Sequence, residues 1–176
     1  PSKKDTETIL RIQIFLDGKM YGPGKIDGRM GQFTRKAVAH YNFGYDLQYD
    51  NYYKVINESN AVVDQLFTTY TIKEEDYKFV GEVSFEPSEQ AEIDYLYYRS
   101  ILEFAAERFH SDEKYLTKIN PETDWEKVVA GTVIKVPNVT SFKIEDVRKD
   151  KSFLRERKLS KRLVIVDTSQ KLVTIW

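Results

Sequence analysis

The sequence predicts an α+β fold in which a small helical bundle is followed by a βααβ unit and a C-terminal β-hairpin. Apolar residues recur at helical spacing within residues 1–45 and again within residues 98–119. Short β-branched runs at 69–73, 132–136 and 163–176 are bounded by turn residues, which is typical of strands. A chain of 176 residues is long enough for one ordinary domain or for two or three small modules.

The composition excludes several classes of function. Apolar residues make up 41% of the chain and charged residues 31%, which indicates a packed core beneath a soluble surface. The formal net charge of −1 gives no overall field toward nucleic acid or an anionic membrane, and no apolar run approaches the ~20 residues that span a bilayer. The absence of cysteine excludes disulfides, thiolate metal sites and cysteine nucleophiles within this chain. Because the chain starts at Pro1 instead of Met, we expect a processed or trimmed start.

Residues 1–60 are expected to form a helical domain with two clear amphipathic helices separated by a Gly/Pro-rich loop. The residues expected to begin and end these helices are Asp5 or Thr6, Gly18, Gln32 and Gly44. A third helix is not evident in the Tyr-rich stretch 46–57, which has little periodicity. In the apolar connector that follows, Asn60 is expected to cap a helix that continues through Phe67.

The loop between the first two helices contains the pattern Asp-Gly-x-x-Gly-x-x-Thr, and it is flanked by Ile12-Gln13 and Ala37-Val38. In this order and spacing the region resembles the peptidoglycan-binding domain that accompanies many bacterial wall hydrolases and transpeptidases. The resemblance makes four residues candidate ligand contacts: Gln13, Asp27, Gly28 and Thr34. The physical alternative is that Asp27 accepts backbone N–H bonds, that Gly28 and Gly31 allow positive φ, and that Thr34 braces the second helix. Both interpretations stay open at this point.

Residues 98–139 are organised as two short helices and a strand. Ser100 and Glu103 form a capping box for the first helix, and Ser111 is expected to cap the second. Asn120-Pro121 ends the second helix, because proline cannot continue it. A further helical turn is expected after a cap formed by Thr123 and Glu126, and Gly131 then precedes the strand 132–136.

This order resembles the lysin motif (LysM), a βααβ module that binds N-acetylglucosamine polymers, with Thr69–Lys73 as its first strand. The corresponding domain spans residues 61–139 and has an insertion at 74–97, which is expected either to cover the ligand groove or to leave it open. The resemblance places the groove at two loops, whose residues are Ile72, Lys73 and Glu74 in the first and Asn120, Pro121, Glu122 and Thr123 in the second. Backbone groups there would bind acetamido groups. A double substitution at Asn120 and Thr123 is expected to weaken glycan binding without unfolding the chain.

Residues 140–162 are expected to form a basic linker, because eight Lys and Arg residues lie between 148 and 162. The alternative is binding of an anionic polymer, either wall polymers or nucleic acid. Residues 163–176 then resemble the opening hairpin of L,D-transpeptidase (YkuD-type) catalytic domains. The resemblance implies that the catalytic region, with its cysteine nucleophile, lies beyond Trp176. An unpaired apolar edge at Leu172–Trp176 also predicts a dimer formed by strand exchange.

No catalytic or metal constellation is recognisable in the sequence, and no cofactor is expected. His40 and His110 are the two histidines, and neither lies in a metal-binding spacing. The sequence therefore predicts a non-catalytic, wall-associated region of the cell envelope that binds peptidoglycan glycan strands and positions a missing catalytic domain. The alternative is a scaffold that packs on the catalytic domain and binds no sugar. A carboxylate-dependent glycan hydrolase and nucleic-acid binding are the less favoured hypotheses.

Overall fold

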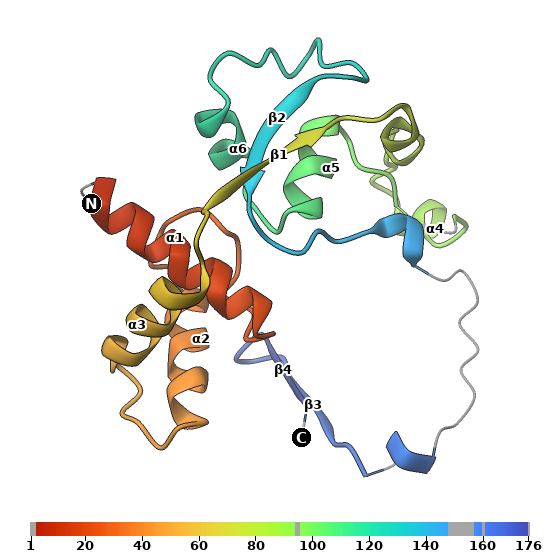
Figure 1. Ribbon diagram of the computed structural model, residues 1–176. Helices are drawn as coiled ribbons and strands as arrows, with labels where there is room; N and C mark the ends of the chain where they lie inside the picture. Colours follow the sequence, from red (N-terminus) through yellow and green to blue (C-terminus); the bar gives the residue numbers. More distant parts are fainter. Residues whose placement is uncertain (1–2, 94–95, 148–156, 160, 176) are drawn as a thin grey trace. The chain divides into compact units, whose positions relative to one another are not determined.

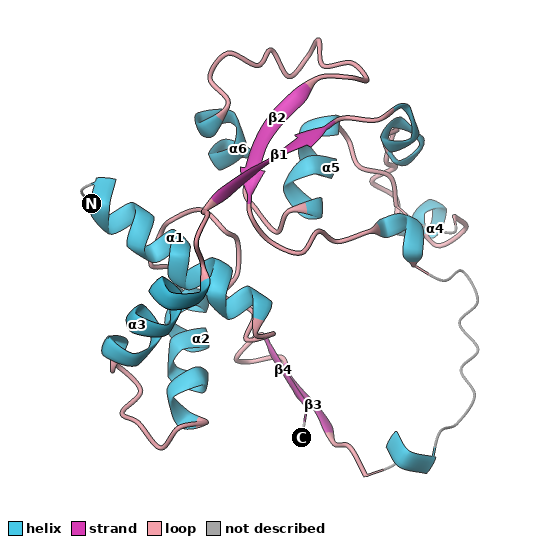
Figure 2. Cartoon of the chain, in the orientation of Figure 1, coloured by secondary structure: helices cyan, strands magenta, loops and turns pink. Residues whose placement is uncertain are grey.

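The computed structural model describes residues 3–93, 96–147, 157–159 and 161–175. The chain has the predicted α+β class, with helices and two separate pairs of antiparallel strands (Figure 2). The α-helices are α1 (Lys3–Gly18), α2 (Gln32–Phe43), α3 (Tyr52–Val62), α4 (Pro87–Gln90), α5 (Ile101–Arg108) and α6 (Glu113–Ile119). The strands are β1 (Phe67–Thr71), β2 (Val133–Pro137), β3 (Val164–Asp167) and β4 (Leu172–Ile175), and the 3₁₀ turns are η1 (Glu74–Phe79), η2 (Ile144–Asp146) and η3 (Arg157–Leu159). The chain divides into two compact units, Pro1–Asp146 and Val147–Trp176.

Helices α1 and α2 have the predicted ends at Gly18, Gln32 and Gly44, although α1 begins at Lys3, before the predicted caps. Their apolar faces form one core with α3, because residues at helical spacing lie on the same side of each helix. The fully buried side chains of this core include Leu10, Ile12, Leu16, Val38, Tyr41 and Val55. Gly31 is the N-cap of α2 and has φ −75°, so it does not use the positive φ that a glycine allows there.

Helix α3 lies where the sequence indicated no helix. Asn51 caps it, since its side chain accepts a 3.0 Å hydrogen bond from the N–H of Tyr53. The buried Asn42 of α2 donates to the Gln48 and Asn51 carbonyls, at 3.0 and 2.8 Å, and thereby holds the preceding loop. Asn60 lies inside α3, so the helix predicted from Asn60 through Phe67 is wrong.

Strands β1 and β2 form an antiparallel pair from Phe67↔Pro137 to Thr71↔Val133, and β1 begins two residues before the predicted strand. Figure 1 shows α5 and α6 packed beside this pair, in the chain order β1, α5, α6, β2. Together they bury a second core, whose members include Ile72, Phe104, Ala105, Leu116, Ile134 and Val136. Ile119 and Val139 pack against both cores, so the two cores of this unit are continuous.

The predicted cap of α5 is present, but its second hydrogen bond differs. Ser100 Oγ accepts from the N–H of Glu103 at 3.0 Å. The Glu103 carboxylate accepts from the N–H of Arg99, at 2.6 Å, in place of the N–H of Ser100 that a capping box uses. The local S-x-x-E signal therefore located the helix start correctly.

The cap of α6 is Asp112, so the prediction of Ser111 is wrong. The Asp112 carboxylate accepts from the N–H groups of Lys114 and Tyr115. Ser111 Oγ instead donates to the Ile26 carbonyl at 2.8 Å, and the Ile26 N–H donates to the His110 carbonyl at 2.7 Å. A tertiary contact between the helical bundle and the βααβ part thus replaces the local cap.

Two further segments have little helix in the structure. Within the insertion at 74–97, α4 is a single turn that ends at Gln90. The turn expected after Thr123 is not helical, because Asp124 accepts from the N–H of Glu126 in a local turn.

The second unit contains the predicted hairpin, with β3 and β4 paired from Val164↔Ile175 to Asp167↔Leu172. The Val164, Val166, Val173 and Ile175 side chains are 56–66% exposed. Trp176, together with residues 148–156 and 160 of the predicted basic linker, lies outside the described residues. Among the described helices, none has the length and apolar character needed to cross a bilayer.

Candidate functional site

The four candidate residues of the first loop lie together around the buried carboxamide of Gln13, which is 1% exposed. Gln13 Nε2 lies 3.1 Å from Asp27 Oδ1 and 3.2 Å from Thr34 Oγ1. Its Oε1 accepts from the N–H groups of Asp27 and Gly28 at 3.1 and 2.8 Å. The Gln13 side chain therefore ties the whole loop to α1.

The other loop residues are engaged in the same way. Asp27 Oδ1 accepts from the N–H of Arg29 at 2.9 Å, and Thr34 Oγ1 donates to the Pro23 carbonyl at 3.0 Å. Gly28 has φ +70°, and a Cβ there would lie 2.7 Å from Thr6 Cγ2, so only glycine fits. These groups hold the loop conformation, whereas ligand contact by this loop stays a prediction.

Asn120, in the second predicted loop of the groove, is 9% exposed and ties α6 to β2. Its Nδ2 donates to the carbonyls of Leu116 and Lys135 at 2.9 and 2.8 Å, and its Oδ1 accepts from the N–H of Lys135 at 2.7 Å. Both amide hydrogens are thus engaged. Because of these bonds, we expect substitution of Asn120 to lower the stability of the fold as well.

The neighbouring groove residues differ in exposure. Ile72 is buried, and its N–H and carbonyl pair with Thr132 and Gly131 at 2.9 and 2.8 Å. Lys73 and Glu74 are exposed, although the Lys73 N–H donates to Asp76 Oδ2 at 2.8 Å. Pro121 and Glu122 are exposed as well, while Thr123 is half-buried, and its N–H donates to the Asn120 carbonyl at 3.1 Å.

The insertion at 74–97 is tied to the connection between α6 and β2. Tyr77 of η1 donates its phenolic hydrogen to the Val128 carbonyl in this connection, at 2.5 Å. Trp125, also in this connection, packs against the βααβ core. The insertion therefore contacts the connection that also carries the second set of predicted groove residues, 120–123.

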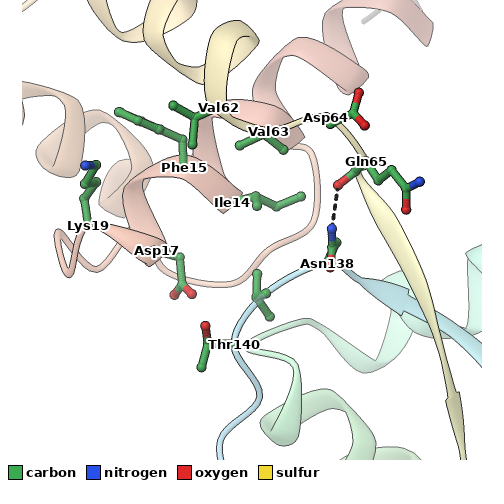
Figure 3. A pocket seen from close by; sticks show the side chains of 12 residues that line it. Ile14, Phe15, Asp17, Lys19, Val62, Val63, Asp64, Gln65, Asn138 and Thr140 are labelled. Carbon is green, nitrogen blue, oxygen red and sulfur yellow. Dashed lines mark hydrogen bonds between the residues drawn. The ribbon is translucent and has the colours of Figure 1, made fainter.

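An open pocket of about 580 Å³ lies elsewhere in the same unit, at the C-terminal end of α1 (Figure 3). Three segments line it: the end of α1, the connection from α3 to β1, and the chain after β2. The lining residues are Ile14, Phe15, Asp17, Gly18, Lys19, Val62, Val63, Asp64, Gln65, Asn138, Val139 and Thr140. None of these twelve residues was predicted as a site residue.

The pocket has an apolar floor and a few polar groups at its margin. Ile14, Phe15 and Val63 are at most 7% exposed. In Figure 3 the Asp17 carboxylate and the Thr140 hydroxyl face each other. Asn138 Nδ2 donates to the Gln65 carbonyl at 3.0 Å, which joins two of the three segments.

Asp17 is paired with His110, which precedes α6. His110 Nδ1 lies 2.9 and 3.0 Å from the two Asp17 carboxylate oxygens. This hydrogen bond raises the pKa of His110 above its usual value, against the opposing effect of partial burial. A hydrogen-bonded His–Asp pair therefore lies at the margin of the pocket and joins α1 to the βααβ part.

Nothing in the described part of the chain brings three or more His, Asp or Glu side chains into a metal-binding group. The chain contains no cysteine. Comparison with protein-family models gives no match, and comparison with curated proteins gives none either. The family resemblances of the sequence therefore remain expectations.

The pocket was missed because its residues carry no local signal. Ile14 and Phe15 read as core positions of a helix, and Val139 reads as the end of a strand. They meet only because α6 and β2 fold back onto the helical bundle. A sequence pattern within a single helix or strand does not show which elements meet in the fold.

Proposed function

We propose that this chain is a non-catalytic, wall-glycan-binding region of the cell envelope that positions an L,D-transpeptidase-like catalytic domain. The proposal combines the three resemblances of the sequence in their order along the chain. Each resembles a family that acts on or binds the bacterial wall. The lack of cysteine agrees with a catalytic domain separate from this region, because the thiolate nucleophile of that transpeptidase family would have to lie outside this chain.

The observation that supports the proposal most is the arrangement of β1, α5, α6 and β2. Strands β1 and β2, which lie far apart in the sequence, pair antiparallel, and the helices α5 and α6 between them in the chain pack on this pair. A βααβ unit is what the lysin-motif resemblance implies. Fold alone does not establish ligand binding, so the proposal needs a direct test.

Such a region would act by effective concentration. Weak binding to an immobile glycan network keeps a tethered domain near its substrate, and two linked contacts bind more tightly than either alone. High affinity for one sugar unit is not required. We therefore expect measurable retention on the polymer together with weak binding of short oligomers.

A second candidate function is the scaffold that packs on a catalytic domain and binds no sugar. The hydrogen bond from Tyr77 to Val128 favours it, because it ties the insertion to the connection that carries the second part of the predicted groove. Engagement of the Asn120 carboxamide favours it too, since no amide hydrogen is left for a ligand.

A pull-down on insoluble peptidoglycan, with chitin in parallel and the salt concentration varied, tests the proposal. Retention that survives moderate salt supports glycan binding, because binding through exposed charges alone weakens with ionic strength. A chain that stays in the supernatant on both polymers contradicts the proposal and leaves the scaffold as the better function. Turnover of the polymer would contradict both.

A further inference from the structure

We propose that the glycan binds in the pocket formed by the end of α1, the α3–β1 connection and the chain after β2, and not in the predicted groove. This inference rests on the proposed function and adds the location of the site. The pocket is made of residues 14–19, 62–65 and 138–140. We name it the junction pocket, because it lies where the helical bundle meets the βααβ part.

The size and floor of the junction pocket suit one or two sugar rings. Its volume of about 580 Å³ is within the range of small-molecule sites, roughly 300–1,000 Å³. Ile14, Phe15 and Val63 supply an aliphatic and aromatic floor that is already buried and ordered. The C–H faces of a pyranose ring and the methyl of an acetamido group are the parts of an amino sugar that gain from such a floor.

The polar groups at the margin suit the rest of such a ligand. Each carboxylate oxygen of Asp17 can accept a further hydrogen bond beside the one from His110. The Thr140 hydroxyl makes no hydrogen bond to another described residue, and it faces Asp17 (Figure 3). An acetamido N–H and ring hydroxyls are donors and acceptors of the matching kind.

The charges around the junction pocket disfavour a strongly charged ligand. Lys19 supplies one ammonium group, while Asp17 and Asp64 supply two carboxylates, of which Asp17 is paired with His110. In Figure 3 the Asp64 side chain points away from Ile14. A neutral N-acetylated sugar therefore fits this margin better than a polyanion does.

The two predicted sites are less suited than the junction pocket. Around Gln13 the polar side chains bond to one another and to the loop backbone. Beside the groove, Tyr77 of the insertion bonds to Val128, and within it Asn120 bonds to β2. The junction pocket combines open volume with polar groups that can still accept or donate.

Gly18 offers a way to fill the junction pocket without distorting the fold. A Cβ at Gly18 meets no atom within 4 Å, and its backbone is outside the left-handed region. Gly18→Trp therefore adds an indole to the pocket lining without a clash at its root. Glu7→Trp is the matched control, because Glu7 is an exposed residue on the same helix and does not line the pocket.

The experiment measures retention of the full chain on insoluble peptidoglycan and the Kd for chitotetraose by titration calorimetry. We expect Gly18→Trp to raise the Kd about tenfold or more and to abolish retention, whereas Glu7→Trp binds as the wild type does. Near-UV circular dichroism checks the fold of each variant. If Gly18→Trp is unfolded, Thr140→Trp replaces it, since Thr140 is exposed and lies outside helices and strands.

Each other outcome overturns a separate part of the inference. Equal binding by wild type and Gly18→Trp overturns the junction pocket and leaves the proposed function standing. Loss of binding in Gly31→Trp, but not in Gly18→Trp, assigns the ligand to the loop around Gln13. Retention on peptidoglycan with none on chitin overturns the amino sugar as ligand and favours the peptide part of the wall. No binding by the wild type rejects the proposed function and the pocket together.

Discussion

Helix α1 carries two regions that contrast in how their polar groups are used. On one side Gln13 holds the loop that contains Asp27 and Thr34, and every candidate side chain there bonds within the loop. At its C-terminal end α1 borders the junction pocket, where Thr140 has no hydrogen-bond partner among the described residues and Asp17 retains acceptor capacity. The first region is conspicuous in the sequence, and the second is not.

This difference indicates that a recognisable sequence motif reflects, in the first place, the residues that its backbone conformation requires. A loop with Gly28 at φ +70° and buried N–H groups requires specific residues at specific spacings, so it leaves a pattern in the sequence. A pocket between elements requires only a suitable shape and a few uncommitted polar groups. The contrast predicts that substitutions at the motif chiefly change stability, while substitutions at the pocket chiefly change binding.

The largest effect is expected for Gln13→Leu. The change removes the partner of the Asp27 and Gly28 N–H groups, which stay buried or half-buried, so we expect a loss of about 3 kcal/mol in the free energy of unfolding. Urea unfolding followed by circular dichroism measures it. Gln32→Leu is the control, because Gln32 is exposed at the start of α2. A loss of unfolding free energy below about 1 kcal/mol would contradict the contrast between the two regions, because the motif would then contribute little to stability.

Asn120→Ala is expected to cost somewhat less, about 2 kcal/mol, because it removes hydrogen bonds to Leu116 and Lys135 without deleting a large apolar group. The same unfolding experiment applies, with the exposed Asn57→Ala as control. If Asn120→Ala keeps the wild-type stability and loses glycan binding, the predicted groove is the site and the junction pocket is not.

Local signals accounted for much of the fold. The cap at Ser100, the proline after Asn120 and the β-branched run at 132–136 each act within a few residues, so the sequence predicts α5, the end of α6 and β2. Helix α3 was missed because much of its support is tertiary: Asn42, from another helix, holds the loop that carries its cap. The cap of α6 was misplaced for the same reason, since the Ser111 hydroxyl bonds to Ile26 in the bundle.

A smaller loss of stability is expected from the ion pair of Arg108 with Glu145, a residue in the chain after β2. Arg108 is buried and pairs through two nitrogens with the Glu145 carboxylate at 3.0 and 2.8 Å. This pair lowers the pKa of Glu145 to about 2, from an ordinary value of 4.5. Glu145 is partly exposed, so we expect Glu145→Gln to cost about 1 kcal/mol at pH 7.

The pH dependence of that loss distinguishes an ion pair from mere packing. A carboxyl whose folded pKa is depressed stabilises the fold above its ordinary pKa and loses this contribution as the pH falls toward the folded pKa. The stability difference between wild type and Glu145→Gln should therefore narrow between about pH 5 and pH 2. A difference that stays constant over this range would show that the charge of Glu145 contributes nothing.

The smallest effect is expected for the pair of His110 and Asp17, at the margin of the junction pocket. Asp17 from α1 and Glu107 from α5 are the charged groups that raise the pKa of His110. A histidine with a raised folded pKa stabilises the fold fully below its unfolded pKa, near 6.5, and the contribution is lost as the pH rises through the folded pKa. Because the His110 side chain is 34% exposed, we expect the change to stay below about 1 kcal/mol.

His110→Asn is the variant that tests this pair with little backbone strain, since His110 has φ +51° and asparagine tolerates the left-handed region. The wild type should lose stability relative to His110→Asn as the pH rises from 6 to 9. Glycan binding decides whether the pair matters to the pocket. If Asp17 is a ligand acceptor, Asp17→Asn weakens binding of chitotetraose both at pH 6 and at pH 9, whereas His110→Asn leaves binding nearly unchanged. Equal binding by Asp17→Asn and wild type would mean that the pair joins α1 to the βααβ part and takes no part in recognition, so that Asp17, like the side chains around Gln13, serves the fold.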